Sequence, residues 1–238
     1  MDKIKPNEQT VTELQKIIKL FLQRALEAEL EEALGYDKYA VSEKSTPNSR
    51  NGYSKKNVKT EFGSILIQIP RDRKCEFHPA IIPKHNRSLS GVENKLLALC
   101  SRNSIKDFTG IMKDQYGDAF LLRRMSERIM PDICLWKTRT LSRVYRNVEI
   151  EPLYGKNGRS IMFYAVLGVT LEGEYEIISL WHRESETPEF WLKVLNDIRD
   201  RGTNEVISFK MEIQSNAFSA MCSAVYPDSK MKVEEISS

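Results

Sequence analysis

Apolar residues follow helical spacing in the first part of the chain. Between residues 9 and 34 they recur every three or four positions, which predicts a helix with one apolar face that ends at Gly35. The acidic run from Glu27 to Glu32 is interpreted as a solvated face. The apolar face can pack on its own domain or support self-association, and the pattern leaves both open. Its members are Val11, Leu14, Ile18, Phe21, Leu22 and Ala25.

A polar loop and a hairpin are expected next. Residues 36–54 are polar and include the turn-forming run STPNSRNG. Apolar residues in 58–62 and 65–69 predict two strands joined by a turn at Gly63-Ser64 and closed by Pro70.

Helical patterns return after an extended arm. Pro79 and Pro83 favour an arm without regular structure up to Arg87. Helices are expected at 91–100, 105–115 and 119–131, and the break Tyr116-Gly117-Asp118 separates the last two. Such a pair is the outline of a helix-turn-helix DNA reader, whose second helix enters the major groove. Helices joined through a glycine also occur in other helical domains, so the pattern alone leaves DNA binding open.

After Trp136 the apolar spacing becomes that of strands. Three strands followed by alternating helix and strand is the order of an RNase H-like domain. The expected fold class is an α+β N-terminal helical, DNA-binding region followed by a partial α/β RNase H-like domain with a mixed sheet. Strands are predicted at 144–151, 160–170, 176–181, 205–211 and 230–236, helices at 187–201 and 216–225, and domains at 1–50, 51–90, 91–140 and 141–238.

Charge is distributed unevenly along the chain. Residues 1–140 hold 25 Lys and Arg against 18 Asp and Glu, whereas the remainder holds 11 against 15. Residues 50–90 carry nine basic and three acidic residues, a density that suits phosphate contact, although a solvated surface has the same composition. The residues expected to bind DNA are Arg50, Lys55, Lys56, Lys59, Arg71, Arg73, Lys84, Arg87, Arg123, Arg124 and Arg128.

Several classes of protein and site are excluded by missing patterns. No apolar run is long enough for a membrane span or a secretory signal, so a cytoplasmic protein without a membrane partner is expected. The sequence has no Walker motif, no glycine-rich dinucleotide loop and no nucleophile elbow. The spacing of its cysteines favours reduced thiols over a zinc site, and nothing at ligand spacing surrounds its histidines. These residues are Cys75, Cys100, Cys134, Cys222, His78, His85 and His182.

Several blocks of the sequence, taken in order and spacing, resemble the mutator-type transposases of bacterial insertion sequences. The likeness runs from about Glu27 to Pro227. The blocks are EAELEEALGYDKY, NSRNGYSKKNVKTEFGSILIQIPRDRKCEFHPAIIPKH, the pair Tyr116-Gly117, Trp136, LSRVY, LGVTLEG, FWLKVLNDIRDRG and AVYP.

This resemblance implies a fold similar to that of RNase H nucleases and an Asp, Asp, Glu set that binds two divalent ions, Mg²⁺ or Mn²⁺. Two metals roughly 4 Å apart activate the attacking oxygen and stabilise the leaving oxygen of a phosphodiester. Oxygen-rich sites of this kind suit magnesium. The implied partner is double-stranded DNA at the terminal inverted repeats of an insertion sequence.

The resemblance places the first two carboxylates at Glu151 and Glu212, which are therefore the candidate catalytic and metal-binding residues. In the family the first Asp sits six residues after a Val-Tyr pair, here Val144-Tyr145. The second sits eleven residues after an arginine that precedes glycine, here Arg201. Counting backwards from the following helix reaches Ile213 instead of Glu212.

Departures from the family pattern lead to the expectation of impaired catalysis. Glutamate keeps the charge of aspartate but adds a methylene, and catalytic metal geometry tolerates little displacement. The third carboxylate is expected beyond Ser238, as in a truncated transposase. From spacing alone, the favoured interpretation is that Glu149 and Glu151 face solvent and that Glu212 ends a strand.

Two functions remain open from the sequence. The first is a truncated, catalytically impaired transposase. The second is a non-catalytic DNA-binding or interaction protein derived from one, which acts as a competitor or regulator. A more remote interpretation is an unrelated helical protein whose basic residues only solvate it.

Overall fold

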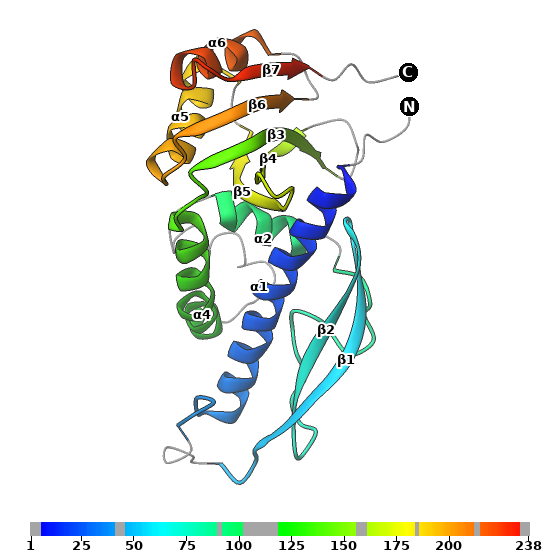
Figure 1. Cartoon of the computed structure of the whole chain (residues 1–238). Helices are drawn as coiled ribbons and strands as arrows, with labels where there is room; N and C mark the ends of the chain where they lie inside the picture. The colour runs from blue at the N-terminus through cyan, green and yellow to red at the C-terminus, as the bar shows by residue number, and fades with distance from the viewer. Residues whose placement is uncertain are drawn as a thin grey trace. The chain divides into compact units, whose positions relative to one another are not determined.

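The computed structural model describes residues 6–40, 46–89, 92–101, 119–155, 161–183, 186–211 and 215–233 (Figure 1). The chain forms two compact units. The first comprises residues 1–13 and 135–238, and the second comprises residues 14–134. None of the helices within the described ranges is long and apolar enough to cross a membrane.

The first helix, α1, spans Glu8–Leu34 and agrees with the predicted helix. Asn7 caps its start, since the Asn7 Oδ1 accepts the backbone N–H of Thr10 at 2.7 Å. Gly35 ends it with a φ of 72°, and its N–H donates to the Glu31 carbonyl at 2.9 Å. The apolar face is buried at Leu14, Ile18, Phe21, Leu22 and Ala25.

The hairpin consists of β1 (Arg50–Thr60) and β2 (Gly63–Asp72), which pair antiparallel. Its loop is Glu61-Phe62, so the predicted turn at Gly63-Ser64 is wrong by two residues. The Thr60 hydroxyl closes this loop, because it accepts the Phe62 N–H at 3.0 Å and donates to the Gly63 carbonyl at 2.8 Å. Gly63 opens β2 with a φ of 99°, a conformation that glycine adopts without strain.

An arm without helix or strand follows the hairpin, over residues 74–87. The Glu29 carboxylate holds it, accepting the backbone N–H groups of Ala80 at 2.6 Å and Ile81 at 2.9 Å. The expected solvated face at the end of α1 is therefore wrong in part, because Glu29 and Glu31 are each only 4% exposed. Burial is tolerated there because the Glu29 carboxylate accepts backbone N–H groups that the irregular arm leaves unpaired.

Two more helices complete the second unit, α2 (Val92–Ser101) and α4 (Ala119–Thr138), and the last residues of α4 belong to the first unit. α4 continues through Pro131, beyond the end predicted for it. The predicted helix at 105–115 and the break before α4 lie outside the described residues.

The first unit is built on a mixed five-stranded sheet with the order β5-β4-β3-β6-β7. β3 pairs antiparallel with β4 and parallel with β6; β4 and β5 are antiparallel, and β6 and β7 are parallel. Two helices, α5 and α6, connect the parallel strands. The bounds are β3 Val144–Tyr154, β4 Ile161–Val169, β5 Tyr175–His182, α5 Pro188–Asp200, β6 Glu205–Met211, α6 Asn216–Val225 and β7 Lys230–Val233. The predicted mixed sheet and its element order are confirmed.

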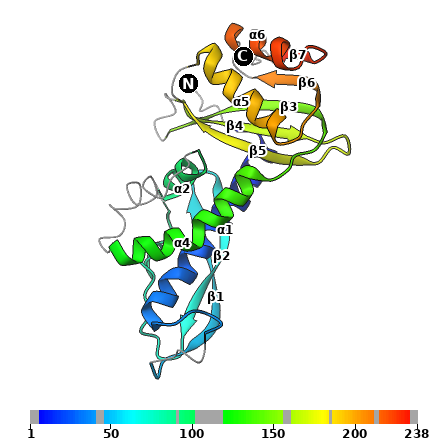
Figure 2. The ribbon, with the colours of Figure 1, turned by 90° about the vertical axis from the view of Figure 1, so that its left-hand side faces the viewer.

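Helices α5 and α6 cover one face of this sheet (Figure 2). Fully buried Trp191 of α5 lies at the centre of the resulting core. Its ring centroid is 5.1 Å from that of Tyr164 on β4 and 5.0 Å from that of Phe218 on α6. Val148 and Ile150 of β3 face the same core. Because successive strand residues point to opposite faces, Glu149 and Glu151 lie on the other face of the sheet.

Candidate DNA interface and acidic strand

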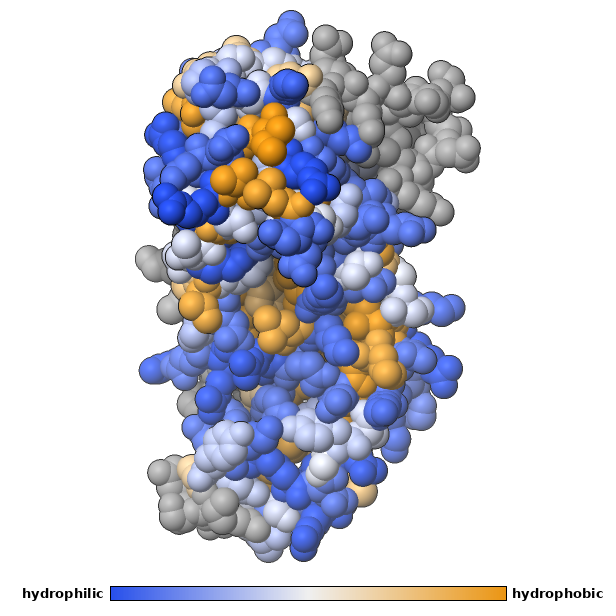
Figure 3. Space-filling model, in the orientation of Figure 1, coloured by the Kyte–Doolittle hydropathy of each residue, from blue (hydrophilic) through white to orange (hydrophobic). Residues whose placement is uncertain are grey.

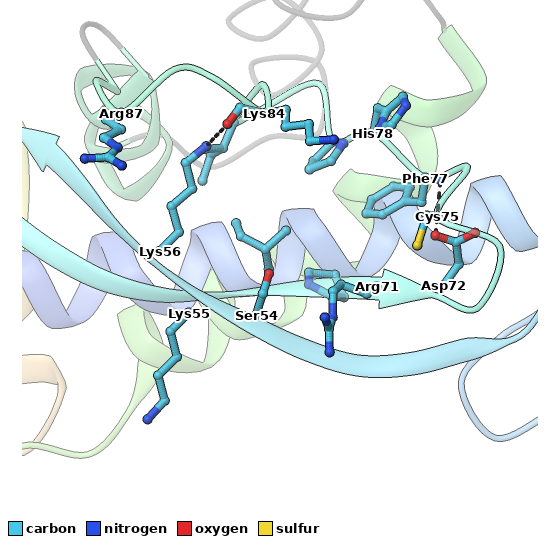
Figure 4. A pocket seen from close by; sticks show the side chains of 14 residues that line it. Ser54, Lys55, Lys56, Arg71, Asp72, Cys75, Phe77, His78, Lys84 and Arg87 are labelled. Atoms are coloured by element: carbon cyan, nitrogen blue, oxygen red, sulfur yellow. Dashed lines mark hydrogen bonds between the residues drawn. The ribbon is translucent and has the colours of Figure 1, made fainter.

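The hairpin and the arm enclose a pocket of about 390 Å³ (Figure 4). Apolar side chains of β2 and of the arm form part of its wall, among them Ile69, Phe77 and Ile82. The pocket is also lined by basic residues that the sequence predicts to bind DNA: Lys55, Lys56, Arg71, Lys84 and Arg87. Residues far apart in the sequence thus bring five basic residues to the lining of one hollow.

Within the described part of the chain, none of these five cations forms an ion pair with a carboxylate. The pocket-lining carboxylate Asp72 is engaged elsewhere: it accepts the Asn48 side-chain amide at 2.6 Å and the N–H groups of Glu76 at 3.0 Å and Phe77 at 3.2 Å. Burial raises the pKa of the Asp72 carboxyl, but these hydrogen bonds outweigh it, and the pKa lies below its usual value. The local field of the pocket is therefore positive and suits an anion.

Lys56 is the cation most firmly placed in the pocket. Its Nζ donates to the carbonyls of Pro83 at 2.9 Å and Lys84 at 3.2 Å, and Figure 4 shows it reaching from the hairpin to the arm. Burial lowers the pKa of Lys56 below its usual value, and the charge of Arg87 lowers it further. Lys55 and Arg71 extend away from the arm in the same view. An anion in the pocket would relieve the repulsion between Lys56 and Arg87.

Two residues predicted to bind DNA, Arg50 and Arg128, form ion pairs with carboxylates. Arg50 lies 3.7 Å from the Glu31 carboxylate and stacks on the ring of Tyr36, 5.0 Å from its centroid. Arg128 lies 2.8 Å from Glu31 and 3.0 Å from Asp37. These contacts give both arginines a structural role in closing the end of α1.

The remaining predicted DNA contacts are dispersed. Arg123 on α4 is exposed and pairs with Glu127 at 3.0 Å. Lys59 and Arg73 are exposed at the hairpin outside the pocket, and the side chain of Arg124 lies outside the described residues. Over the hairpin the surface is largely hydrophilic with an apolar area among the polar residues (Figure 3).

The acidic strand is β3, where Glu149 and Glu151 are 6% and 4% exposed. The expectation that both face solvent is therefore wrong. Asn7 covers the Glu151 carboxylate, because its backbone N–H donates to Oε2 at 3.2 Å and its side-chain amide donates to Oε1. Alternation along a strand assigns a residue to a face, and only the tertiary fold decides whether that face is covered.

The other candidate metal ligand, Glu212, lies outside the described residues. Its predecessor Met211 pairs in the parallel register with Ile150, the predecessor of Glu151. Across the described ranges no three His, Cys, Asp or Glu side chains are grouped to hold a metal ion. Glu149 and Glu151 alone do not make the carboxylate cluster that a two-metal centre requires.

The sequence patterns do not indicate the structural roles of two residues, Asn7 and Arg201. Asn7 before the first helix is a recognisable cap signal, but nothing in the sequence indicates its bond to Glu151. The second is Arg201, whose buried guanidinium donates to the carbonyls of Arg139 at 3.2 Å and Ile178 at 3.0 Å. Burial lowers the pKa of Arg201 below its usual value. Arg201 ties the end of α5 to β5.

Comparisons with known proteins relate the chain to transposases. Residues 2–232 match the family described as "Transposase, Mutator family". The chain is similar to a probable transposase for an ISRM3-like insertion sequence element of Sinorhizobium fredii, with 30% identity over 82% of this chain and 50% of that protein. It is also similar to the IS1201 transposase of Lactobacillus helveticus, with 29% identity over 82% of this chain and 55% of that protein. The chain spans about half the length of these relatives.

Proposed function

We propose, since this chain belongs to the Mutator family of transposases, that it binds double-stranded DNA through its basic hairpin and arm, with insertion-sequence ends as the target. The observation that carries the proposal is the set of five cations around the pocket that have no carboxylate partner within the described residues. Each such cation placed against a phosphate releases condensed counterions, which is the main source of affinity for nucleic acid.

The first unit is, in this proposal, an RNase H-like domain. Counted along the chain, its strands occupy the sheet in the order third, second, first, fourth and fifth, and the second is antiparallel to its neighbours. This arrangement supports the assignment, because the candidate carboxylate Glu151 lies on the first strand, in the middle of the sheet. The parallel pairing of Met211 with Ile150 supports a neighbouring position for the strand that precedes Glu212.

Strand cleavage by this chain is proposed to be weak. Both oxygens of the Glu151 carboxylate accept hydrogen bonds from Asn7. A divalent ion, Mg²⁺ or Mn²⁺, would have to displace them, and it would also have to accommodate the extra methylene of a glutamate. No step of strand chemistry follows from the described residues alone.

The same contact favours a second candidate function, a DNA-binding competitor or regulator without catalysis. If the Asn7 bonds to Glu151 persist when DNA is bound, the basic pocket still occupies DNA ends while no metal reaches the strand. The two candidates share the DNA interface and differ only in the chemistry at β3.

Gel-shift and nicking assays test the proposal together. The wild-type chain is expected to shift a labelled duplex at low salt, and the double variant Lys56→Gln/Arg87→Gln is expected to bind it at least tenfold more weakly. Lys193→Gln removes an exposed charge from α5 in the other unit and serves as the matched control. Equal binding by the double variant and this control would overturn the proposed interface.

Nicking of supercoiled plasmid in Mg²⁺ or Mn²⁺ separates the two candidates. Slow nicking that disappears in Glu151→Ala supports the impaired transposase. Binding without nicking by the wild type supports the competitor. Nicking that is gained in Asn7→Ala would show that the Asn7 side chain blocks Glu151, and its absence in this variant would show that the block lies elsewhere. Nicking that is as fast in Glu151→Ala as in the wild type would remove Glu151 from the chemistry.

A further inference from the structure

We infer that the pocket between hairpin and arm binds one unstacked nucleotide of a DNA strand, with its base against the apolar wall and its phosphate on the cations. This inference rests on the proposed DNA-binding function and specifies what enters the pocket. A continuous duplex cannot place a base in such a hollow, because its bases are stacked inside the helix and present only their edges in the grooves.

The size of the pocket supports a ligand of this class. Its volume of about 390 Å³ lies within the range of sites that hold small molecules, about 300–1,000 Å³. Contacts to duplex phosphates need only exposed cations, and Lys59 and Arg73 already provide these outside the pocket. A hollow with apolar side chains therefore suits a ligand that has an apolar surface of its own.

The wall offers a rigid aromatic ring for a base. Phe77 is half-buried and packs against the cluster of Leu30, Leu34 and Tyr36, which holds the ring in place. Its backbone N–H is fixed by the Asp72 carboxylate, and the side chain also lines the pocket. Bases from single strands are recognised by stacking on aromatic side chains, and a ring that is already immobilised loses little entropy on binding.

The cations suit the phosphate of the same nucleotide. Figure 4 shows Lys56, Lys84 and Arg87 on the arm side of the hairpin, the side on which Phe77 and His78 also lie. The Lys56 ammonium is anchored to arm carbonyls, so its charge is presented at a defined position. The pocket therefore joins an apolar wall and basic side chains in one hollow of about 390 Å³.

The test compares three labelled DNAs of the same sequence: a blunt duplex, a duplex with a short unpaired tail, and the tailed duplex with abasic sites in the tail. We expect the intact tail to lower the Kd of the full chain by at least about fivefold relative to the blunt duplex, the lower end of what one base-aromatic stack contributes. The abasic tail should lose this gain, because it keeps the phosphates but has no bases.

Variants of pocket residues test whether the gain in affinity from the unpaired tail arises in the pocket. Phe77→Leu keeps an apolar side chain on the underlying cluster but removes the ring, and Arg87→Gln removes a charge from an exposed side chain. Both should abolish the preference for the tail. Lys59→Gln, which removes a charge from β1 outside the pocket, should weaken the binding of blunt and tailed DNA equally and preserve the ratio of their Kd values.

Thiol alkylation gives a second measure of whether the tail occupies the pocket. Cys75 is exposed and lines the pocket, whereas Cys134 is exposed on α4 and serves as an internal reference. The tailed duplex should slow alkylation of Cys75 more than the blunt duplex does, with no such difference at Cys134.

The outcomes are distinguishable. Equal affinity for tailed and blunt duplexes, or a tail preference that survives in Phe77→Leu and Arg87→Gln, overturns the inference and leaves the proposed function standing. Failure to bind any of the three DNAs overturns both. A tail preference that is lost in both pocket variants and kept in Lys59→Gln supports the nucleotide pocket.

Discussion

At the scale of single residues, Asn7 performs two tasks that can be separated by substitution. Its Oδ1 caps α1 through Thr10, and its N–H groups bind Glu151. Asn7→Ala should cost about 1–2 kcal/mol in the free energy of unfolding, in the range of lost caps. Asn7→Ser keeps a capping oxygen and should recover part of this loss in urea denaturation.

Asn7→Asp would bring a second carboxylate against Glu151 and is expected to be less stable than Asn7→Ser. Gln9→Ala, an exposed change in the same helical turn, should stay within about 0.5 kcal/mol of the wild type. Equal stability of the Ser and Ala variants would show that the cap contributes nothing.

Glycine is required at position 168 on β4 because neighbouring side chains leave no room for a Cβ. A Cβ at this position would lie 2.4 Å from Tyr145 Cε1 and 2.8 Å from Ile178 Cδ1. Because both neighbours are fully buried, Gly168→Ala should cost about 1–3 kcal/mol of unfolding free energy. Glu172→Ala, in the exposed turn after β4, is the control, and a loss no larger in Gly168→Ala than in this control would contradict the packing argument.

At the scale of elements, the hairpin and the arm are joined by the turn around Asp72. Hydrogen bonds hold the pKa of the Asp72 carboxyl below its usual value, so the ionised form stabilises the fold at pH values above the unfolded-state pKa of about 3.9. This stabilisation disappears as the pH falls through the lower folded-state pKa.

Asp72→Asn should therefore be less stable than the wild type near neutral pH, and the difference should shrink as the pH falls below about 4. Urea denaturation at a series of pH values measures this. Lys74→Gln changes a charge in the same turn without removing a carboxyl. Its difference in unfolding free energy from the wild type should therefore not shrink below about pH 4 in the same way. If Asp72→Asn were less stable than the wild type by the same amount at every pH, the ionisation of Asp72 would not contribute to stability.

At the scale of the whole molecule, charge is divided between the two units of the chain. The second unit carries the hairpin, the arm and the basic residues that line their pocket, so it should supply the salt dependence of DNA binding. The logarithm of the association constant falls linearly with the logarithm of the salt concentration, and each phosphate contact that is lost should make this slope shallower by about 0.9.

Lys84→Gln should therefore lower this slope by about one contact in a fluorescence titration over a salt series. Lys193→Gln on α5 should leave the slope unchanged, because this residue belongs to the other unit. Identical slopes in both variants would place the DNA outside the pocket.

The sequence by itself determined the elements and the family. Helical and strand spacing located α1, α6 and β6 to within a residue, because these elements bury an apolar face and their side chains repeat with the period of the backbone. The hairpin was less well predicted, since polar residues such as Lys55 and Lys56 extend β1 well beyond its apolar part.

Only the tertiary structure decided which polar groups are buried and paired. Glu29, Glu31 and Glu151 resemble solvated residues in the sequence, yet each is buried where backbone N–H groups or distant side chains contact its carboxylate. Arg50 is likewise paired, whereas among the described residues Lys84 and Arg87 have no carboxylate partner. Local spacing sets the face of an element on which a side chain lies, but its partners come from segments far away in the chain.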